Sequence, residues 1–476
     1  MEFPTIQFAY FALITLTISW LVRQQRTLQK AFLLVVSYYF AWKWQPLFLA
    51  TIVGSSLLNY GVGKALVRLK GTPGAKPVLV AGLLANLGVL GFFKYYGFFI
   101  DNLGNLLGLL GLEAHLPLIE VIAPFGISFY TFQGMAYIVD THRGKAVQPE
   151  TLLDFLLFIA FFPQLAAGPI CRSHQLLPQL HKPAPERVPE LSRAVALIIT
   201  GLFKKMVMAT YLASHLTTDA FIVPQNFSSL ELVLAVFAYT AQVYLDFSGY
   251  TDLARGVGLL FGFQIPENFN YPYAATNIGE FWRRWHITFS TWLREYIYFP
   301  LGGSRKGRAR TYFNLMVTFV ACGVWHGSSW GYIIWGALHG LGLSLYKASL
   351  DYRRLWGLKS EGPWPFWWHA AGWFSTLSFC AFARIFFKTN DLTTAFAVWG
   401  RLFEGSFLGA GLDLGVLALT VLTFAMNFYG RPVFNLLVRA HDALPTPTRP
   451  FAWVGAMLVL FTLKPFGMAA TIYFSF

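Results

Sequence analysis

The chain has 476 residues, of which 56% are hydrophobic, 18% aromatic and 12% charged, and its formal net charge is +14. Soluble domains usually carry about 25% charged residues, so this composition excludes an ordinary soluble protein. It predicts an all-α polytopic membrane protein in which residues 1–476 form a single integral membrane domain. The positive charge suits loops that face an anionic lipid surface, so membrane lipid is an expected partner and nucleic acid is not.

The first apolar segment, residues 6–22, is expected to be a retained membrane helix. Glu2 precedes it and a basic cluster, residues 23–30, follows it, whereas a signal peptide carries its positive charge in front. The positive-inside rule then places the N-terminus outside the membrane. Between residues 30 and 64 the chain crosses the membrane twice or not at all, with a hinge at the sequence WKWQP, residues 42–46.

Charge and apolar length predict the remaining topology. Basic clusters are expected in the cytoplasm, and stretches with acids but no lysine or arginine are expected outside. The basic clusters are residues 23–30, 64–76, 142–145, 172–193, 305–310 and 347–359, and the external stretches are residues 101–120 and 217–230. Further membrane spans are expected at residues 78–100, 118–139, 232–250, 312–325, 330–346, 367–387, 414–429 and 453–474.

Two regions differ from simple crossings. Lys204 and Lys205 interrupt residues 194–216, and residues 152–168 are short and contain glycine. Short helices at membrane depth are tolerated only where protein or water satisfies their backbone, so residues 152–168 are expected to be re-entrant. A bilayer crossing needs about 20 residues, and the chain is expected to make about eleven or twelve crossings.

Residues 277–299 are expected to form one amphipathic helix that lies in the membrane interface. Helical spacing places five aromatic residues on one stripe, Phe281, Trp285, Phe289, Trp292 and Tyr296, and the polar contacts come from Glu280, Arg283, Arg284, Arg294 and Glu295. Glu280 can pair with Arg283 or Arg284, three or four residues later. His286 lies among these aromatics, where it either packs within an anchor or takes part in chemistry.

A second histidine, His326, lies in the sequence VWHGSSW, residues 324–330. An ionisable residue inside an apolar segment is a functional-site hypothesis, and the alternative is a structural histidine bonded to a nearby carbonyl. His339 follows thirteen residues later, roughly 20 Å away if one helix continues. Unless the chain breaks at residues 327–329, His286 is therefore the better partner for His326, and His339 is expected to be structural.

Asp246 ends an otherwise uncharged apolar segment in the sequence QVYLDFSGYTD, residues 242–252. A carboxylate at such a position is paired, hydrogen-bonded or exposed to a polar cavity. It either orients a histidine or pairs with a basic residue such as Arg255, and structural pairing is favoured. The sequence contains no phosphate-binding loop, dinucleotide fingerprint, zinc-type cysteine spacing or serine nucleophile elbow.

Five blocks of sequence occur in order: FFPQLAAGPI (residues 161–170), YLDFSGYTDLARG (244–256), FGFQIPENFNYPY (261–273), EFWRRWHITFSTWLREYIYFPLGG (280–303) and VWHGSSWGYIIWGALHG (324–340). Together they resemble the membrane-bound O-acyltransferase family, and within it the bacterial branch that serves alginate and cellulose acetylation. This motif-bearing core, residues 160–340, is about a third of the chain. The resemblance implies a helical membrane fold around a central funnel or tunnel.

The resemblance also implies site residues. The histidine of the WHG block, His326, corresponds to the essential catalytic residue, and the histidine of the RRWH block, His286, to a second one. Many eukaryotic relatives carry an asparagine motif at this earlier position. Asp246, Trp325, Glu280 and Arg283 are expected to support the two histidines, and no metal or tightly bound cofactor is expected.

The activity implied is transfer of acetyl from a cytoplasmic thioester, acetyl-CoA, across the bacterial inner membrane for O-acetylation of an exopolysaccharide. A periplasmic acetyltransferase and a polysaccharide synthase complex are the expected partners. Histidine suits the removal of a hydroxyl proton near neutral pH. The basic loop 305–310 either attracts the phosphates of the donor or is only a solvated cytoplasmic loop. The alternatives are D-alanyl transfer to teichoic acid from a carrier protein, and a non-catalytic channel or scaffold that passes acyl groups.

Overall fold

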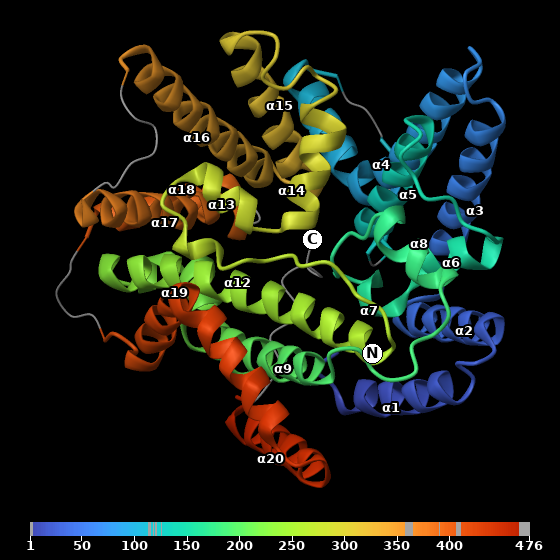
Figure 1. Cartoon of the computed structure of the whole chain (residues 1–476). Helices are drawn as coiled ribbons and strands as arrows, with labels where there is room; N and C mark the ends of the chain where they lie inside the picture. Colours follow the sequence, from blue (N-terminus) through green and yellow to red (C-terminus); the bar gives the residue numbers. More distant parts are fainter. Residues whose placement is uncertain are drawn as a thin grey trace. The chain divides into compact units, whose positions relative to one another are not determined.

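The structure is a computed structural model that describes residues 3–112, 116, 117, 119, 121–124, 126–357, 365–389, 391–405 and 411–465, and over these residues it is built from helices (Figure 1). It divides into two compact units. Unit 1 comprises Met1–Leu197 and Thr251–Pro266, and unit 2 comprises Ile198–Tyr250 and Glu267–Phe476.

Unit 1 holds the N-terminal helices. They are α1 (Ile6–Leu21), α2 (Arg26–Trp44), α3 (Pro46–Arg68), α4 (Ala75–Leu109), α5 (Ile127–His142), α6 (Leu152–Ala160), α7 (Phe162–Leu165), α8 (Ser173–His181), most of α9 (Leu191–Leu202) and the end of α12 (Ser229–Leu260). The expected hinge at residues 42–46 is confirmed, because α2 ends where Gln45 adopts an extended backbone and Pro46 begins α3.

The helix expected at residues 118–139 begins later than its hydropathy predicted, although residues 118, 120 and 125 lie outside the described part. The start of α5 is set by Gly126, whose φ of 68° is left-handed. A side chain at Gly126 would also meet the carbonyl oxygen of Leu165 at 2.9 Å. Only glycine combines this backbone with so close an approach, and the helix therefore starts at Ile127.

A buried ion pair joins α2 to α6 within unit 1. Lys30 Nζ lies 2.6 Å from Asp154 Oδ1, and the two side chains are 9% and 0% exposed. The other carboxylate oxygen of Asp154 accepts hydrogen bonds from the backbone and hydroxyl of Thr151, at 3.0 and 2.8 Å, and so caps the start of α6. Asp154 is thus neutralised and hydrogen-bonded, as a buried charge requires.

Unit 2 holds the rest of the chain. After the end of α9 come η1 (Phe203–Ala209), α10 (Thr210–Leu212), η2 (Ala213–Thr217), α11 (Asp219–Ile222), η3 (Pro224–Asn226) and the first part of α12. They are followed by η4 (Pro272–Ala274), α13 (Ile278–Arg284), α14 (Ile287–Leu293), η5 (Arg294–Tyr298), α15 (Arg308–His326), α16 (Trp330–Leu355), α17 (Phe366–Lys388), α18 (Leu392–Phe403), α19 (Leu414–Ala443), η6 (Thr446–Thr448) and α20 (Arg449–Leu463).

Glycines allow α16 to pack closely against its neighbours in unit 2. A side chain at Gly336 would collide with the carbonyl oxygen of Phe319 on α15, and one at Gly331 would collide with that of Phe386 on α17. Small residues permit such close helix contacts, so glycine at these two positions lets α16 approach both α15 and α17.

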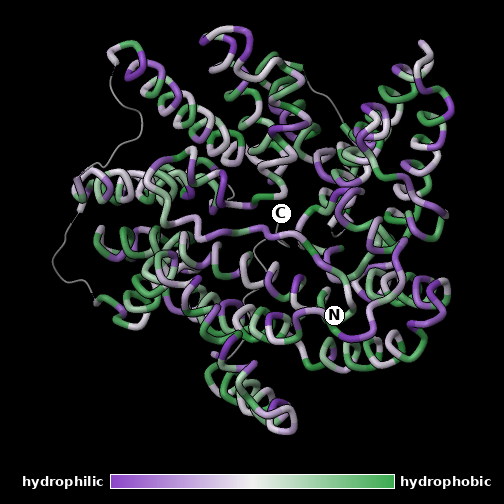
Figure 2. Tube along the Cα trace, viewed as in Figure 1, coloured by the Kyte–Doolittle hydropathy of each residue, from purple (hydrophilic) through white to green (hydrophobic). Residues whose placement is uncertain are grey.

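Six described helical stretches are long and apolar enough to cross a membrane: Pro46–Arg68, Ala75–Leu109, Leu191–Thr217, Ser229–Leu260, Phe366–Lys388 and Leu414–Ala443. Figure 2 shows the apolar residues that run along the helices. The prediction of an all-α polytopic membrane protein is confirmed. The count of eleven or twelve crossings and the re-entrant assignment of residues 152–168 stay predictions, and the end of the span at 453–474 lies outside the described residues.

The Lys30–Asp154 pair generates a test of stability. In Lys30→Met the carboxylate of Asp154 loses its cation but keeps its capping bonds, so unfolding should become easier by about 3–5 kcal/mol. Thermal unfolding of the detergent-purified protein measures this change. The control is Asp351→Ala, which breaks the more exposed pair Lys347–Asp351 and should cost no more than about 0.5 kcal/mol. Equal unfolding temperatures for Lys30→Met and the wild type would contradict the stabilising role of the pair.

Candidate functional site

His326 is the last residue of α15, and aromatic rings surround it. It is 4% exposed. Its ring centroid lies within 6.5 Å of five others, at 4.8 Å from Trp325, 4.9 Å from Phe387, 5.0 Å from Trp335, 6.1 Å from Phe289 and 6.4 Å from Tyr332. The helix stops here because Gly327 is extended, and Ser329 caps α16 by accepting a bond from the Gly331 backbone at 3.2 Å. The imidazole therefore sits at a helix end inside an apolar shell.

His286 lies between α13 and α14, and the prediction of one continuous helix over residues 277–299 is wrong. Trp285 leaves the helical region and His286 has φ 42° and ψ 56°, a left-handed conformation. Backbone hydrogen bonds with the preceding loop hold the break, since Ile287 N donates to Asn268 O at 2.8 Å and Asn270 N to Arg284 O at 3.0 Å. Residues other than glycine adopt this conformation at a cost, and such residues cluster at functional sites.

The aromatic stripe expected to face the membrane interface is instead largely buried. Phe281, Trp285, Phe289 and Trp292 are all buried within unit 2. The break at His286 turns α13 and α14 so that their aromatic residues line the interior. The interfacial-anchor hypothesis for this segment is therefore wrong.

Asn268 determines which nitrogen of His286 carries the proton. Its Oδ1 accepts hydrogen bonds from the backbone N and hydroxyl of Thr288, at 3.2 and 2.8 Å. A backbone N–H only donates, so this atom of Asn268 is the oxygen. His286 Nδ1 lies 3.1 Å from the same oxygen and must donate to it, which leaves the lone pair on Nε2. Burial lowers the pKa of His286 to about 3, so its ring is neutral near neutral pH.

The structure brings the two predicted histidines to the same pair of aromatic side chains. Phe289 lies 5.0 Å from His286 and 6.1 Å from His326 between ring centroids. Trp325 lies 6.0 Å from His286 and 4.8 Å from His326. Both imidazole rings are thus part of one aromatic cluster within unit 2, and the supporting role of Trp325 stays a prediction.

His339 is closer to this cluster than a continuous helix would allow. The chain breaks at residues 327–329, so α16 folds back along α15, and Trp335 contacts both His339, at 4.7 Å, and His326, at 5.0 Å. Trp282 Nε1 donates to His339 Nδ1 at 3.3 Å. This bond holds the ring in place and agrees with the structural role expected for His339.

Asp246 pairs with a lysine within unit 2, and the suggested pairing with Arg255 stays a prediction. The partner of Asp246 is the Lys205 ammonium group on η1. Arg255 lies 3.6 Å from Asp252, one helical turn away. The π-helical turn Phe203–Ala209 directs Lys205 into the interior, which hydropathy did not reveal.

Glu280 forms an ion pair within α13, whereas the Arg283 side chain is exposed. Glu280 Oε1 pairs with Arg284 Nη2 at 2.5 Å, and Oε2 accepts a bond from the Thr276 backbone at 3.0 Å. Glu280 therefore ties α13 to the loop before it. Arg283 is exposed. Of the two arginines that could pair with Glu280, Arg284 is therefore the one that does so.

Sequence reasoning missed two residues of this cluster, Asn268 and Arg384. Asn268 lies inside the family block at residues 261–273, and its place in that block could have marked it as a candidate site residue. Arg384 lies on α17, and its charge within an apolar span could have marked it in the same way. It is 3% exposed, and its guanidinium carbon lies 4.6 Å from the centroid of the Trp285 ring.

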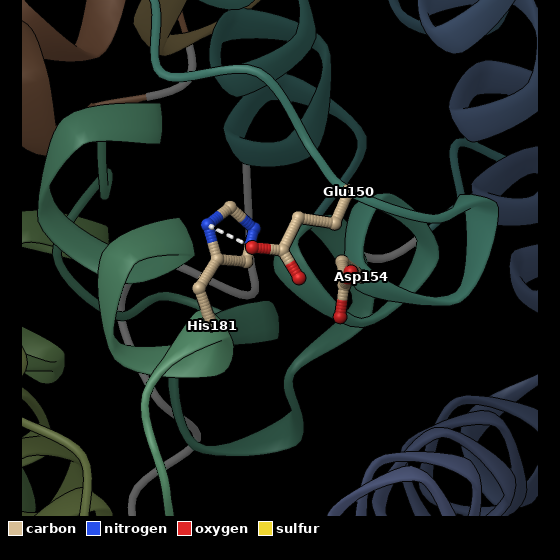
Figure 3. A group of neighbouring side chains, drawn as sticks. All are labelled: Glu150, Asp154 and His181. Atoms are coloured by element: carbon tan, nitrogen blue, oxygen red, sulfur yellow. Dashed lines mark ion pairs between the residues drawn. The ribbon is translucent and has the colours of Figure 1, made fainter.

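One group of side chains in unit 1 has metal-ligand character. Potential ligand atoms of Glu150, Asp154 and His181 lie within 4.8 Å of one another, and His181 Nδ1 is 3.6 Å from Glu150 Oε1 (Figure 3). Asp154, however, already bonds the Lys30 ammonium at 2.6 Å. A cation would have to displace or tolerate this charge, so the donor set does not fit a metal ion.

Comparisons with known proteins agree with the motifs. Residues 6–387 match the membrane-bound O-acyltransferase family. The chain is 38% identical over 422 residues to a probable alginate O-acetylase of Pseudomonas putida, covering 87% of this chain and 83% of that relative. It is 36% identical over 395 residues to a peptidoglycan O-acetyltransferase of Helicobacter pylori, with coverages of 78% and 72%. A teichoic acid D-alanyltransferase of Bacillus subtilis is 30% identical over 244 residues, with coverages of 49% and 62%.

The bonds of Asn268 predict the tautomer of His286. In protein labelled with ¹⁵N-histidine, the His286 signals, identified by their loss in His286→Gln, should show a protonated Nδ1 and an unprotonated Nε2 between about pH 5 and 8. Asn268→Leu removes the acceptor and should abolish this preference. A proton mainly on Nε2 in the wild type would contradict the assignment.

Proposed function

The chain belongs to the membrane-bound O-acyltransferase family, and from this premise we propose that it transfers acetyl from a cytoplasmic thioester for O-acetylation of an exopolysaccharide such as alginate or cellulose. The observation that carries the proposal is the aromatic cluster in which Phe289 and Trp325 each contact both His286 and His326. Such a shell excludes water, which would otherwise compete with the acceptor hydroxyl for the acyl group.

The reaction needs proton transfer and no redox step. The acceptor oxygen attacks the thioester carbonyl carbon while His326 takes the hydroxyl proton. The carbon–sulfur bond then breaks, and the sulfur leaves as a thiol with the proton that His326 returns. His286 Nε2, which carries a lone pair, accepts a hydrogen bond from a reacting group and so orients it.

We propose acetyl-CoA as the donor, with no tightly bound cofactor. Four basic residues are exposed, Arg305 and Lys306 in the loop before α15 and Arg308 and Arg310 in its first turn. They suit the phosphates of coenzyme A. The protein would act in the bacterial inner membrane, beside a periplasmic acetyltransferase and a polysaccharide synthase complex. The relatives named as O-acetylating enzymes are more similar to this chain than the D-alanyltransferase is, and this difference favours acetyl over D-alanyl transfer.

His326 carries the first functional prediction. His326→Ala should lower acetylation of the polymer by at least about 10²- to 10⁴-fold, the effect typical of a missing acid–base group. The measurement is acetyl content of the secreted polymer from cells that hold each variant at equal membrane abundance.

Two other histidines serve as controls for His326. His369 is exposed on α17, so His369→Ala should keep full acetylation, while His339→Ala should act mainly by lowering membrane abundance. Normal acetylation with His326→Ala would remove the proposed base and favour the scaffold alternative.

His286 carries the second functional prediction. His286→Ala and His286→Gly both remove the imidazole, and glycine also adopts the left-handed backbone of this position without strain. Both should insert normally and lower acetylation by at least about tenfold. If His286→Gly inserts normally and retains wild-type acetylation, the ring only fills space.

A further inference from the structure

Arg384 is a cation inside a helix that is long and apolar enough to cross a membrane. It lies one turn before the end of α17, and charges retained within such helices are costly and usually serve function. One turn further along α17, Phe387 contacts His326 at 4.9 Å. The guanidinium also lies over Trp285, the residue directly before His286. Arg384 therefore belongs to the same cluster as both histidines.

No carboxylate in the described part of the chain faces the charge of Arg384. Among the described residues, the other buried lysines and arginines each face a carboxylate, in the pairs Lys30–Asp154, Arg172–Asp140, Lys205–Asp246 and Arg255–Asp252. Within the same part of the chain, no carboxylate lies at ion-pair distance from Arg384. Removing a charge from water without a counter-charge is costly, so the absence of a carboxylate needs a reason.

The contacts of Arg384 hold it in position but leave most of its donors unused. Nη1 donates to the Tyr273 hydroxyl at 2.8 Å, and that hydroxyl donates to the Thr240 carbonyl at 2.8 Å. The Trp285 and Tyr273 rings lie 4.6 and 5.7 Å from the guanidinium carbon, and such cation–π contacts offset part of the desolvation cost. A guanidinium has five N–H donors, and the described residues offer it no further hydrogen bond.

We propose that Arg384 binds the carbonyl oxygen of the acyl group and stabilises the negative charge that forms on it during transfer. This inference rests on the proposed acyl transfer. When the acceptor oxygen bonds to the carbonyl carbon, the carbonyl electron pair moves onto the oxygen, where it meets the guanidinium. The pair returns when the carbon–sulfur bond breaks. A fixed donor aimed at such an oxyanion acts strongly in a water-poor site, and losing one typically costs about 10²- to 10³-fold in kcat.

Kinetics of the full chain in membrane vesicles, with radiolabelled acetyl-CoA as the probe, test the inference. Arg384→Gln should lower kcat by about 10²- to 10³-fold while KM and the affinity for unlabelled coenzyme A change little. Arg384→Lys keeps the charge without the planar fork and should give an intermediate kcat. The matched control is Lys388→Gln, which removes a cation one turn along α17 that lies 5.2 Å from the Tyr239 ring, and it should keep wild-type kcat.

The outcomes separate the explanations. Weaker coenzyme A binding with an unchanged kcat in Arg384→Gln would assign the arginine to a phosphate and overturn the inference. A lower unfolding temperature with wild-type turnover per folded molecule would leave only a structural cation–π contact. If Arg384→Gln does not fold, wild-type kcat in Arg384→Lys overturns the inference. A wild type that transfers no label from acetyl-CoA, by contrast, contradicts the proposed function itself.

Discussion

A charge buried in an apolar chain must be neutralised, and this requirement determines much of the internal structure. In unit 1 the Lys30–Asp154 pair joins α2 to α6 and also caps α6. In unit 2 the Lys205–Asp246 pair joins the π-helical turn η1 to α12. Each pair connects segments far apart in sequence, because only a tertiary contact supplies the opposite charge. Arg384, which faces no carboxylate among the described residues, belongs to the aromatic cluster that holds the two histidines.

The sequence was sufficient to predict those features of the fold and the site that depend on local hydropathy or on long motifs. Hydropathy gave the helical membrane class, the hinge before Pro46 and helices near most expected spans. The ordered blocks led to the family, which the match over residues 6–387 confirms. They also led to His286 and His326, which the structure brings to the same aromatic rings although 40 residues of sequence numbering separate them. Their roles in catalysis stay predictions.

What the sequence did not reveal depends on contacts between distant segments. Residues 277–299 have helical periodicity throughout, yet backbone bonds from Asn268 and Asn270 break the helix at His286. The partner of Asp246 lies on a π-helical turn, and π turns leave no hydropathy signal. The turn at residues 327–329 was recognised as a possible break, but only the folded chain shows that Trp335 then contacts both His326 and His339.

The left-handed backbone at His286 limits which side chains this position can accept without strain. Asparagine, aspartate and histidine enter this region several times more often than other residues, and β-branched residues are genuine outliers there. The backbone thus admits a short list of polar side chains before any chemistry is selected. Histidine is on that list, so the backbone of this position accepts the side chain that the proposed chemistry uses. The conformation of one residue therefore restricts, on steric grounds alone, which substitutions this position tolerates.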